Sequence, residues 1–325
     1  MKILVTGGAG YIGSTLVEKL LQEGHDVTSV DNNSRGSYTH LAGLKGTSNF
    51  KMFVADICNI NQLEKIMKSR EIDVIVHAAA IPGLERCRKK PKDAVLTNIY
   101  GTLNVLEIGR KYDVDRVILT SSAAVYGIPV KTPVSEDHPL NPRNLYGATK
   151  LSAEILMKVY YQTYGLSTVI LRFGNVYGVG LYTYWETVIP RFVMQALSSQ
   201  PLTIYGNGEQ SRDFIHVYDI TKAIILSLNA SKARVDGEIF NVGTGKPTKI
   251  NYLANLVSEI VENITGKQVR KVHLPPRKGE PDIPDFCLSP IKIQERLKFC
   301  TTWRLNDGIK QLVNYWLKVN NPQLS

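Results

Sequence analysis

Short apolar runs alternate with longer amphipathic stretches along the first half of the chain. The runs are rich in β-branched residues, as expected for strands buried on both faces of a parallel sheet. The stretches between them repeat apolar positions with helical spacing. This β–α alternation predicts an α/β fold, a Rossmann-type doubly wound parallel sheet with right-handed crossovers. Strands are expected at residues 2–6, 26–30, 50–54, 73–77, 116–120 and 167–171, and helices at about 14–23, 61–70, 93–111 and 145–164.

The regularity weakens after residue 175, where a segment rich in Gly and Tyr follows. We expect residues 1–175, with about 217–245, to form the Rossmann domain. Residues 176–216 and 246–325 would form a smaller, discontinuous α/β lobe packed on it. Expected helices in this half lie at 188–197, 219–229, 252–263, 290–297 and 306–319, and expected strands at 202–205, 213–216 and 238–242.

The first predicted strand leads directly into a glycine-rich turn. Gly7, Gly10 and Gly13 have the spacing G-x-x-G-x-x-G, which lets the backbone turn tightly and approach a dinucleotide diphosphate at the start of a helix. Asp31 follows the second strand, where a carboxylate accepts hydrogen bonds from an adenosine ribose and repels a 2′-phosphate. These features predict NAD as the cofactor, and Arg35 nearby keeps NADP as the alternative.

Tyr146 and Lys150 lie four residues apart in a predicted helix and therefore share a face. A free tyrosine, with a pKa of about 10, is a poor base at neutral pH. We expect the ammonium of Lys150 to lower the pKa of Tyr146 and make it a proton-transfer group. Ser122 follows another predicted strand and could hydrogen-bond the same reacting oxygen. Alternatively, Ser121 and Ser122 only cap a turn.

Several small or polar residues fall at or just after predicted strand ends. In a doubly wound sheet these ends lie along one edge, where ligands bind. We therefore expect a single site at that edge, although Asp56 could instead cap the helix after it. The residues concerned are Gly7, Asp31, Asp56, Ala79, Ser122 and Asn175.

The composition of the chain narrows the classes of protein. No run approaches the roughly 20 apolar residues that span a bilayer, and the start lacks the pattern of a signal peptide, so a cytoplasmic enzyme without a membrane partner is expected. The four cysteines (58, 87, 287 and 300) lack metal-type spacing, which favours reduced thiols and no metal. The net charge of +10 is densest at residues 86–92. Without aromatic interleaving, a solvated basic face that attracts a diphosphate substrate is favoured over nucleic-acid binding.

As a set, the motifs resemble those of the extended short-chain dehydrogenase/reductase family. Within it the chain is most similar to UDP-glucose 4-epimerases and related nucleotide-sugar 4-epimerases, over nearly its whole length. Matching segments in the second lobe are residues 206–219 and 277–280. The first lobe contributes Gly7–Gly13, Asp31, Asp56, His77–Ala80, Asn98, Ser121–Gly127, Tyr146-x-x-x-Lys150 and Arg172–Gly178.

The resemblance implies an NAD-dependent isomerase that forms a 4-keto sugar transiently, with Tyr146 as acid and base, and a homodimer built on helices 92–111 and 145–164. The implied catalytic residues are Ser122, Tyr146 and Lys150. The implied NAD contacts are Gly7, Gly10, Tyr11, Ile12, Gly13, Asp31, Asn32, Asp56, Ile57, Ala78, Ala79, Ala80, Asn98, Tyr146 and Lys150, with Asn98 more a structural prop than a direct contact. The implied UDP-hexose contacts are Ser122, Tyr146, Asn175, Tyr205, Arg212, Arg277 and Glu280; Arg212 and Arg277 could instead be surface residues.

Two alanines after the catalytic serine, Ala123 and Ala124, distinguish the reaction. Dehydratase relatives carry an acid/base pair there, which alanine cannot replace, so epimerisation is favoured. The preferred substrate pair is UDP-glucose and UDP-galactose. A UDP-N-acetylhexosamine, a UDP-uronate or another nucleobase stays open, because the residue near Phe286 that limits the size of the sugar pocket cannot be aligned with that of relatives. Pro82 and Cys87 depart from the lysine and serine of many relatives.

Two other classes of function share part of this pattern. A net NAD(P)-dependent keto-sugar reductase would use the same first lobe but release its reduced cofactor stoichiometrically. A non-catalytic dinucleotide-sensing or RNA-binding protein would exploit the positive charge and tolerate loss of the Tyr146 hydroxyl. The complete set of Ser122, Tyr146 and Lys150 favours an enzyme over the second of these.

Overall fold

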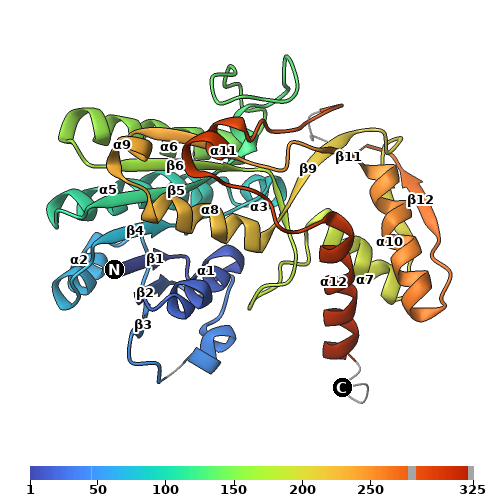
Figure 1. The fold of residues 1–325 in the computed structure, drawn as a ribbon, viewed down its shortest axis with the longest axis horizontal. Helices are drawn as coiled ribbons and strands as arrows, with labels where there is room; N and C mark the ends of the chain where they lie inside the picture. Colours follow the sequence, from blue (N-terminus) through green and yellow to red (C-terminus); the bar gives the residue numbers. More distant parts are fainter. Residues whose placement is uncertain (45, 277–282, 321–325) are drawn as a thin grey trace.

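A computed structural model describes residues 1–44, 46–276 and 283–320 of the chain. A seven-stranded parallel sheet forms its centre, in the order β10-β6-β5-β4-β1-β2-β3 (Figure 1). The order reverses between β1 and β4, and ligands bind at such a switch point. This confirms the predicted Rossmann-type fold. The strands are β1 (Lys2–Thr6), β2 (Asp26–Asp31), β3 (Phe50–Val54), β4 (Val74–His77), β5 (Arg116–Ser122), β6 (Thr168–Phe173) and β10 (Glu238–Val242).

Helices bury both faces of the sheet because successive strand residues point to opposite sides. In β1, Ile3 and Val5 belong to one hydrophobic core, whereas Leu4 belongs to the other. The first core takes α1 (Tyr11–Gln22), α8 (Val217–Asn229) and α11 (Ile291–Leu297). The second takes α2 (Ile60–Ser69), α5 (Gly101–Lys111) and α6 (Leu145–Tyr164).

A second lobe with its own core lies beside the sheet (Figure 1). Its three longer helices are α7 (Val188–Leu197), α10 (Ile250–Thr265) and α12 (Leu305–Asn320). Two small sheets accompany these helices. Each contains one edge strand that the sequence did not predict, β11 (Pro247–Lys249) and β12 (Lys271–Leu274). Such short strands carry little hydrophobic pattern. Their partners are β7 (Asn175–Tyr177), β8 (Leu202–Tyr205) and β9 (Ser211–His216).

The helix expected at 93–111 is present but is interrupted by a π-turn. It runs as α4 (Pro91–Val95), the π-turn Leu96–Tyr100 and α5. π-Turns inside helices occur frequently at functional sites. Two short helices that the apolar pattern does not predict, η1 (Tyr38–Leu44) and α3 (Leu84–Lys89), follow strands β2 and β4.

Candidate active site

A cavity of about 980 Å³ opens at the carboxyl ends of the parallel strands and reaches into the second lobe. Beyond the Rossmann sheet, the lining comes from β7 and the loop after it, the start of α7, β8 and β9. All of the residues expected at strand ends line this one cavity, and their role in a single ligand site stays a prediction. They are Gly7, Asp31, Asp56, Ala79, Ser122 and Asn175.

The glycine turn has the geometry that a dinucleotide diphosphate requires. Gly7 adopts φ +70° and donates its N–H to the Val30 carbonyl at 2.7 Å. A Cβ on Gly13 would come within 2.1 Å of the Gly7 carbonyl oxygen, so only glycine lets α1 pack this closely on the turn. Gly10 caps α1 without any side-chain hydrogen bond, which leaves the first amides of the helix to a ligand.

Two carboxylates line the cavity beyond β2 and β3. Asp31 accepts hydrogen bonds from the backbone N–H of Ala9 at 3.1 Å and of Asn33 at 2.8 Å. Burial raises the pKa of Asp31, which these hydrogen bonds oppose. Asp56 does not cap α2, because Asn59 holds that position and accepts from Gln62 N–H. The lining residues fit NAD: a carboxylate at the end of β2 would accept from the ribose hydroxyls.

Of the residues expected to contact NAD, Asn98 alone does not line the cavity. From the π-turn its side chain accepts from Ile81 N–H at 2.8 Å and donates to the Ile81 carbonyl at 3.0 Å. A further hydrogen bond of 2.9 Å reaches Thr149 on α6. Asn98 therefore ties the loop after β4 to the helix that carries Tyr146 and Lys150.

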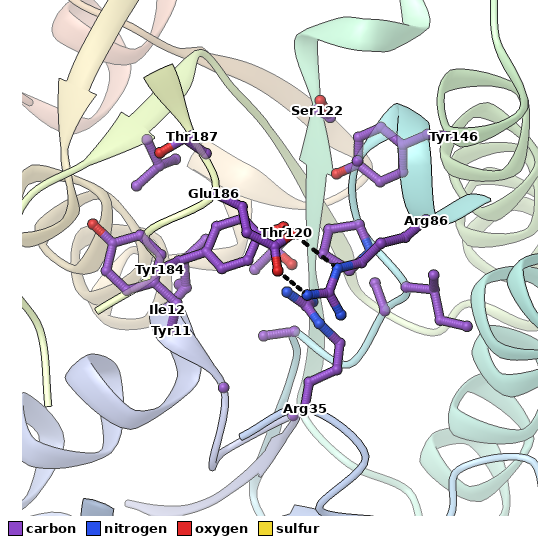
Figure 2. A pocket seen from close by; sticks show the side chains of 18 of the residues that line it. Tyr11, Ile12, Arg35, Arg86, Thr120, Ser122, Tyr146, Tyr184, Glu186 and Thr187 are labelled. Carbon is purple, nitrogen blue, oxygen red and sulfur yellow. Dashed lines mark hydrogen bonds and ion pairs between the residues drawn. The ribbon is translucent and has the colours of Figure 1, made fainter. Parts of the chain in front are cut away.

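Tyr146 and Lys150 lie in the first turns of α6, which begins where Asn144 caps the helix by accepting from Gly147 N–H at 2.9 Å. Both residues line the cavity, and Lys150 is buried. Ser122 is the last residue of β5, and its side chain lies next to the Tyr146 ring (Figure 2). The structure thus brings the three expected catalytic residues together at one end of the cavity.

The expectation that Lys150 lowers the pKa of Tyr146 is wrong for the protein chain without a bound ligand. Burial raises the pKa of Tyr146 to about 12, and the main opposing effect is its hydrogen bond with Ser122, followed by the charge of Arg35. Burial also lowers the pKa of Lys150 to about 8. Sequence spacing placed the two side chains on one face but could not show that both are removed from water, which disfavours both charged forms.

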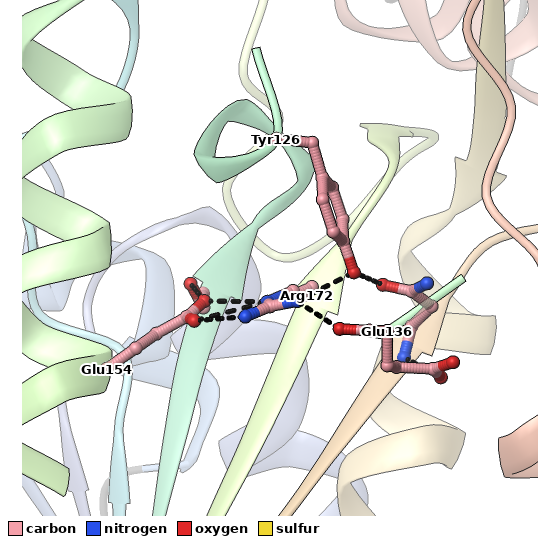
Figure 3. Close-up of polar contacts among 6 residues, drawn as sticks. Tyr126, Glu136, Glu154 and Arg172 are labelled. Atoms are coloured by element: carbon pink, nitrogen blue, oxygen red, sulfur yellow. Dashed lines mark hydrogen bonds and ion pairs between the residues drawn. The ribbon is translucent and has the colours of Figure 1, made fainter. Parts of the chain in front are cut away.

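A buried ion pair joins the middle of α6 to β6 (Figure 3). Arg172 of β6 donates to both carboxylate oxygens of Glu154, with 2.6 Å for the shortest contact, and to the Tyr126 hydroxyl at 2.8 Å. Glu154 also accepts from Ser121, the neighbour of Ser122. Because Glu154 lies one turn after Lys150, this network joins β5, β6 and α6 around the catalytic residues.

The expected substrate residues fall into two groups. Asn175, Tyr205 and Arg212 line the cavity from β7, β8 and β9. Arg212 is held by donation to the carbonyls of Ser211 at 2.7 Å and Ile283 at 2.9 Å. Arg277 and Glu280 lie outside the described residues. Phe286, expected near the sugar, is buried against residues 125 and 126 and is not part of the cavity lining.

Several lining residues were not expected to belong to a site. They come from loops and helix starts far apart in sequence, where no motif marks them. The basic run at 86–92, predicted as a solvated face, contributes three of its cations to the cavity. The unexpected residues are Arg86, Lys89, Lys90, Tyr184, Glu186, Thr187, Arg191 and Gln210, while Arg35 was considered from the sequence only as a contact to NADP.

The fold and the cavity define an enzyme of the Rossmann class that works on a ligand held between its two lobes. Residues 3–243 match the NAD dependent epimerase/dehydratase family. The chain belongs to this family, and its cofactor is NAD. Within the described residues no group of His, Cys, Asp and Glu could hold a metal ion, and no helix there has the length and apolarity needed to cross a membrane.

Individual relatives carry more specific names. A Thermotoga maritima UDP-glucose 4-epimerase, solved with UDP-glucose, has a TM-score of 0.90 and 34% identity, covering 99% of this chain and 100% of that one. A UDP-glucuronate 4-epimerase of Thermodesulfobacterium geofontis is 34% identical over 98% of this chain and 96% of its own length. A Bacillus cereus UDP-glucuronic acid 4-epimerase, solved with its substrate and NAD, has a TM-score of 0.88 and 33% identity, covering 98% of this chain and all of that one. The chain is therefore an NAD-dependent isomerase similar to UDP-sugar 4-epimerases.

Proposed function

We propose that the protein interconverts UDP-glucose and UDP-galactose by epimerisation at C4. The observation that carries this is the convergence of Ser122, Tyr146 and Lys150 at one end of a cavity whose other wall is the glycine turn. The next residues after Ser122 are Ala123 and Ala124, which cannot transfer a proton, so elimination of water has no acid/base pair there. Removal and return of one hydrogen at a carbinol is the chemistry that these residues support.

In the proposed mechanism Tyr146 accepts the proton of the sugar 4-hydroxyl and later gives it back. Ser122 hydrogen-bonds the same oxygen and orients it. The hydrogen bond from Ser122 and the positive charge of Arg35 favour the phenolate against the effect of burial, and a protonated Lys150 would add to them in the proposed mechanism. NAD supplies the acceptor, and then the donor, of the hydride. Since the cofactor is regenerated in each cycle, it can stay bound throughout.

The UDP moiety is assigned to the second-lobe wall of the cavity. Asn175 and Arg212 would hold the diphosphate, because a planar guanidinium can pair two oxygens at once. Tyr205 would offer an aromatic contact to the uridine, and Arg277 and Glu280, outside the described residues, stay expected contacts to the nucleotide from the sequence alone. Relatives named for UDP-glucose support the glucose pair, and those named for UDP-glucuronate make the uronate the main alternative.

The assembly is proposed to be a cytoplasmic homodimer joined through α5 and α6 with the π-turn before α5. This surface exposes several large apolar side chains, which a second copy would bury. We also propose the division into an NAD-binding domain (1–175 with about 217–245) and a nucleotide-sugar lobe (176–216 and 246–325), with the exception that α11 of the second range packs on the Rossmann sheet. The exposed apolar residues are Val95, Leu96, Tyr100, Ile155, Val159, Tyr161 and Tyr164.

The test is incubation of the purified protein with UDP-galactose, UDP-N-acetylgalactosamine and UDP-galacturonate in separate reactions. Chromatography would resolve each sugar nucleotide from its 4-epimer. Conversion of UDP-galactose to UDP-glucose at the highest kcat/KM is the expected result. Conversion of UDP-galacturonate alone would assign a different substrate to the same C4 epimerisation. Conversion of none of the three would reject the epimerase assignment.

A further inference from the structure

Residues 178–187, between β7 and α7, run along the cavity, which Tyr182, Tyr184, Glu186 and Thr187 line. At their start the Tyr11 hydroxyl of α1 donates to the Gly178 carbonyl at 2.7 Å. Gly180 packs so closely on α1 that a Cβ there would lie 2.2 Å from the Thr15 hydroxyl oxygen. The beginning of this segment is therefore fixed directly on the helix that receives a dinucleotide diphosphate.

The middle and end of the segment are fixed on other parts of the Rossmann domain. The ring of Tyr182 stacks on that of His40 from η1, with centroids 4.9 Å apart. Glu186 pairs with Arg86 of α3, whose Nε lies 3.2 Å from the carboxylate. Figure 2 shows this pair above Arg35. The segment is thus held from α1 at one end to α3 at the other.

Arg35 lies under this segment, and the positive charge of its guanidinium is poorly compensated by neighbouring groups. Its guanidinium carbon is 5.1 Å from the centroid of the Tyr184 ring, and its buried Nε has no hydrogen-bond partner in the described structure. Arg86, which acts repulsively on Arg35, already uses the carboxylate of Glu186. Arg35 and Arg86 therefore share a partly desolvated cavity with the carboxylates of Glu186, already paired with Arg86, and of Asp31. An anionic ligand would stabilise this arrangement.

The position of the backbone next to Arg35 indicates which anionic ligand would bind there. A Cβ on Gly36 would come within 1.9 Å of the Ala9 carbonyl oxygen, so this loop lies against the glycine turn itself. The backbone that carries Arg35 therefore lies beside the N-terminus of α1, and the Arg35 side chain lines the same cavity as the glycine turn. The second-lobe residues assigned to the UDP diphosphate lie on the opposite wall of the cavity.

We propose that residues 178–187 form a strap that retains the dinucleotide, and that Arg35 beneath the strap binds the diphosphate of the dinucleotide. NAD then leaves only when the strap detaches from α3, for which the Arg86–Glu186 pair must open. The inference rests on the cofactor site of the proposed function and is independent of which sugar is epimerised. It explains structurally how the cofactor stays bound over many cycles.

The test measures NAD exchange with the purified holoenzyme in the absence of any sugar nucleotide. Protein loaded with radiolabelled NAD is chased with excess unlabelled NAD, and retained label is followed on a filter. R35Q should lose label at least about tenfold faster than the wild type, as expected for removal of a hydrogen bond to a charged group. R86Q and E186Q should each exchange faster, and the double variant no faster than either single one, because they open the same contact.

Arg88→Gln is the matched control, because Arg88 lies on α3 beside Arg86 but pairs with Glu85 of the same helix, outside the cavity. Its exchange rate should equal that of the wild type. Wild-type exchange in R86Q and E186Q would overturn the strap. Wild-type NAD exchange in R35Q, with weaker UDP binding by calorimetry, would assign Arg35 to the sugar nucleotide and overturn its cofactor role. Since no sugar is turned over, failure of the epimerase assay would not produce any of these results.

Discussion

At Tyr146, burial and charge act in opposite directions. Burial raises the pKa of the phenol to about 12, while Ser122 and Arg35 favour ionisation. The positive charge of a bound nicotinamide would add to them. The residue is therefore a poor base in the chain by itself and depends on the groups gathered around it, which is how enzymes tune proton-transfer residues to their reaction.

Tyr146→Phe should reduce epimerase turnover by roughly 10²–10⁴-fold, because it removes the only hydroxyl on α6 that is placed to exchange the proton. Bound NAD, measured after denaturation, should stay at the wild-type level. Tyr252→Phe is the control, since Tyr252 is 60% exposed on α10. Unchanged turnover in Tyr146→Phe would remove Tyr146 from the proposed mechanism.

Lys150 predicts a specific dependence of stability on pH. Its pKa falls from 10.5 to about 8 on folding because burial penalises its charge. Between these values the unfolded chain binds more protons than the folded one, so the free energy of unfolding rises with pH. Below pH 8 the full cost of the buried charge is present. Wild type should gain at most about 3 kcal/mol relative to Lys150→Met between pH 8 and 10.5 in urea unfolding. Parallel curves for the two proteins would show that Lys150 ionises normally in the fold.

At the scale of elements, the catalytic groups depend on how α6 meets the sheet. The helix starts at Asn144 and is joined to β5 and β6 through Glu154, and to the loop after β4 through Asn98 and Thr149. These contacts fix the height and rotation of α6 relative to Ser122. The geometry of the site is therefore set by buried polar contacts between neighbouring elements, not by the cavity residues alone.

Glu154→Gln should destabilise the protein by about 3–5 kcal/mol, because it leaves the buried guanidinium of Arg172 without its charge partner. Glu85→Gln on the exposed Arg88–Glu85 pair is the control and should change stability by less than about 1 kcal/mol. Chemical unfolding monitored by fluorescence would measure both. Equal small changes would mean that the network around Arg172 reorganises without cost.

At the scale of the whole molecule, two lobes with separate cores enclose one cavity, and residues from both line it. The Rossmann sheet supplies the glycine turn and the proposed reacting groups, while the second lobe supplies the wall assigned to the nucleotide. The segment 178–187 contributes to the same cavity. In the proposed function, ligand retention and catalysis would therefore depend on the same boundary between lobes.

The proposed dimer can be tested on its exposed apolar surface. Ile155 on α6 is 53% exposed, and a charge there would be placed inside the interface. Ile155→Glu should convert the dimer to a monomer in sedimentation equilibrium, since an uncompensated buried charge costs several kcal/mol. Ile264→Glu, at a 41% exposed position on α10, should leave the assembly unchanged. A monomeric wild type would contradict the proposed assembly.

The sequence by itself determined the parallel sheet and the glycine turn, and it predicted which residues react. These follow from local periodicity and from spacings such as Gly7-x-x-Gly10-x-x-Gly13 and Tyr146-x-x-x-Lys150, which are set by backbone geometry within one element. Their convergence on one edge also followed, because parallel strands share a common direction. The roles assigned to individual residues stay predictions until the experiments above are done.

Only the tertiary structure decided which loops meet and which charges are removed from water. Arg35, Arg86 and Glu186 are separated by 51 and 100 residues of sequence, and nothing local indicates that they face one another. The buried state of Tyr146 and Lys150, which reversed the expected pKa effect, likewise depends on elements packed around them. Desolvation and long-range ion pairing are properties of the packed chain, so they cannot be deduced from residue spacing along it.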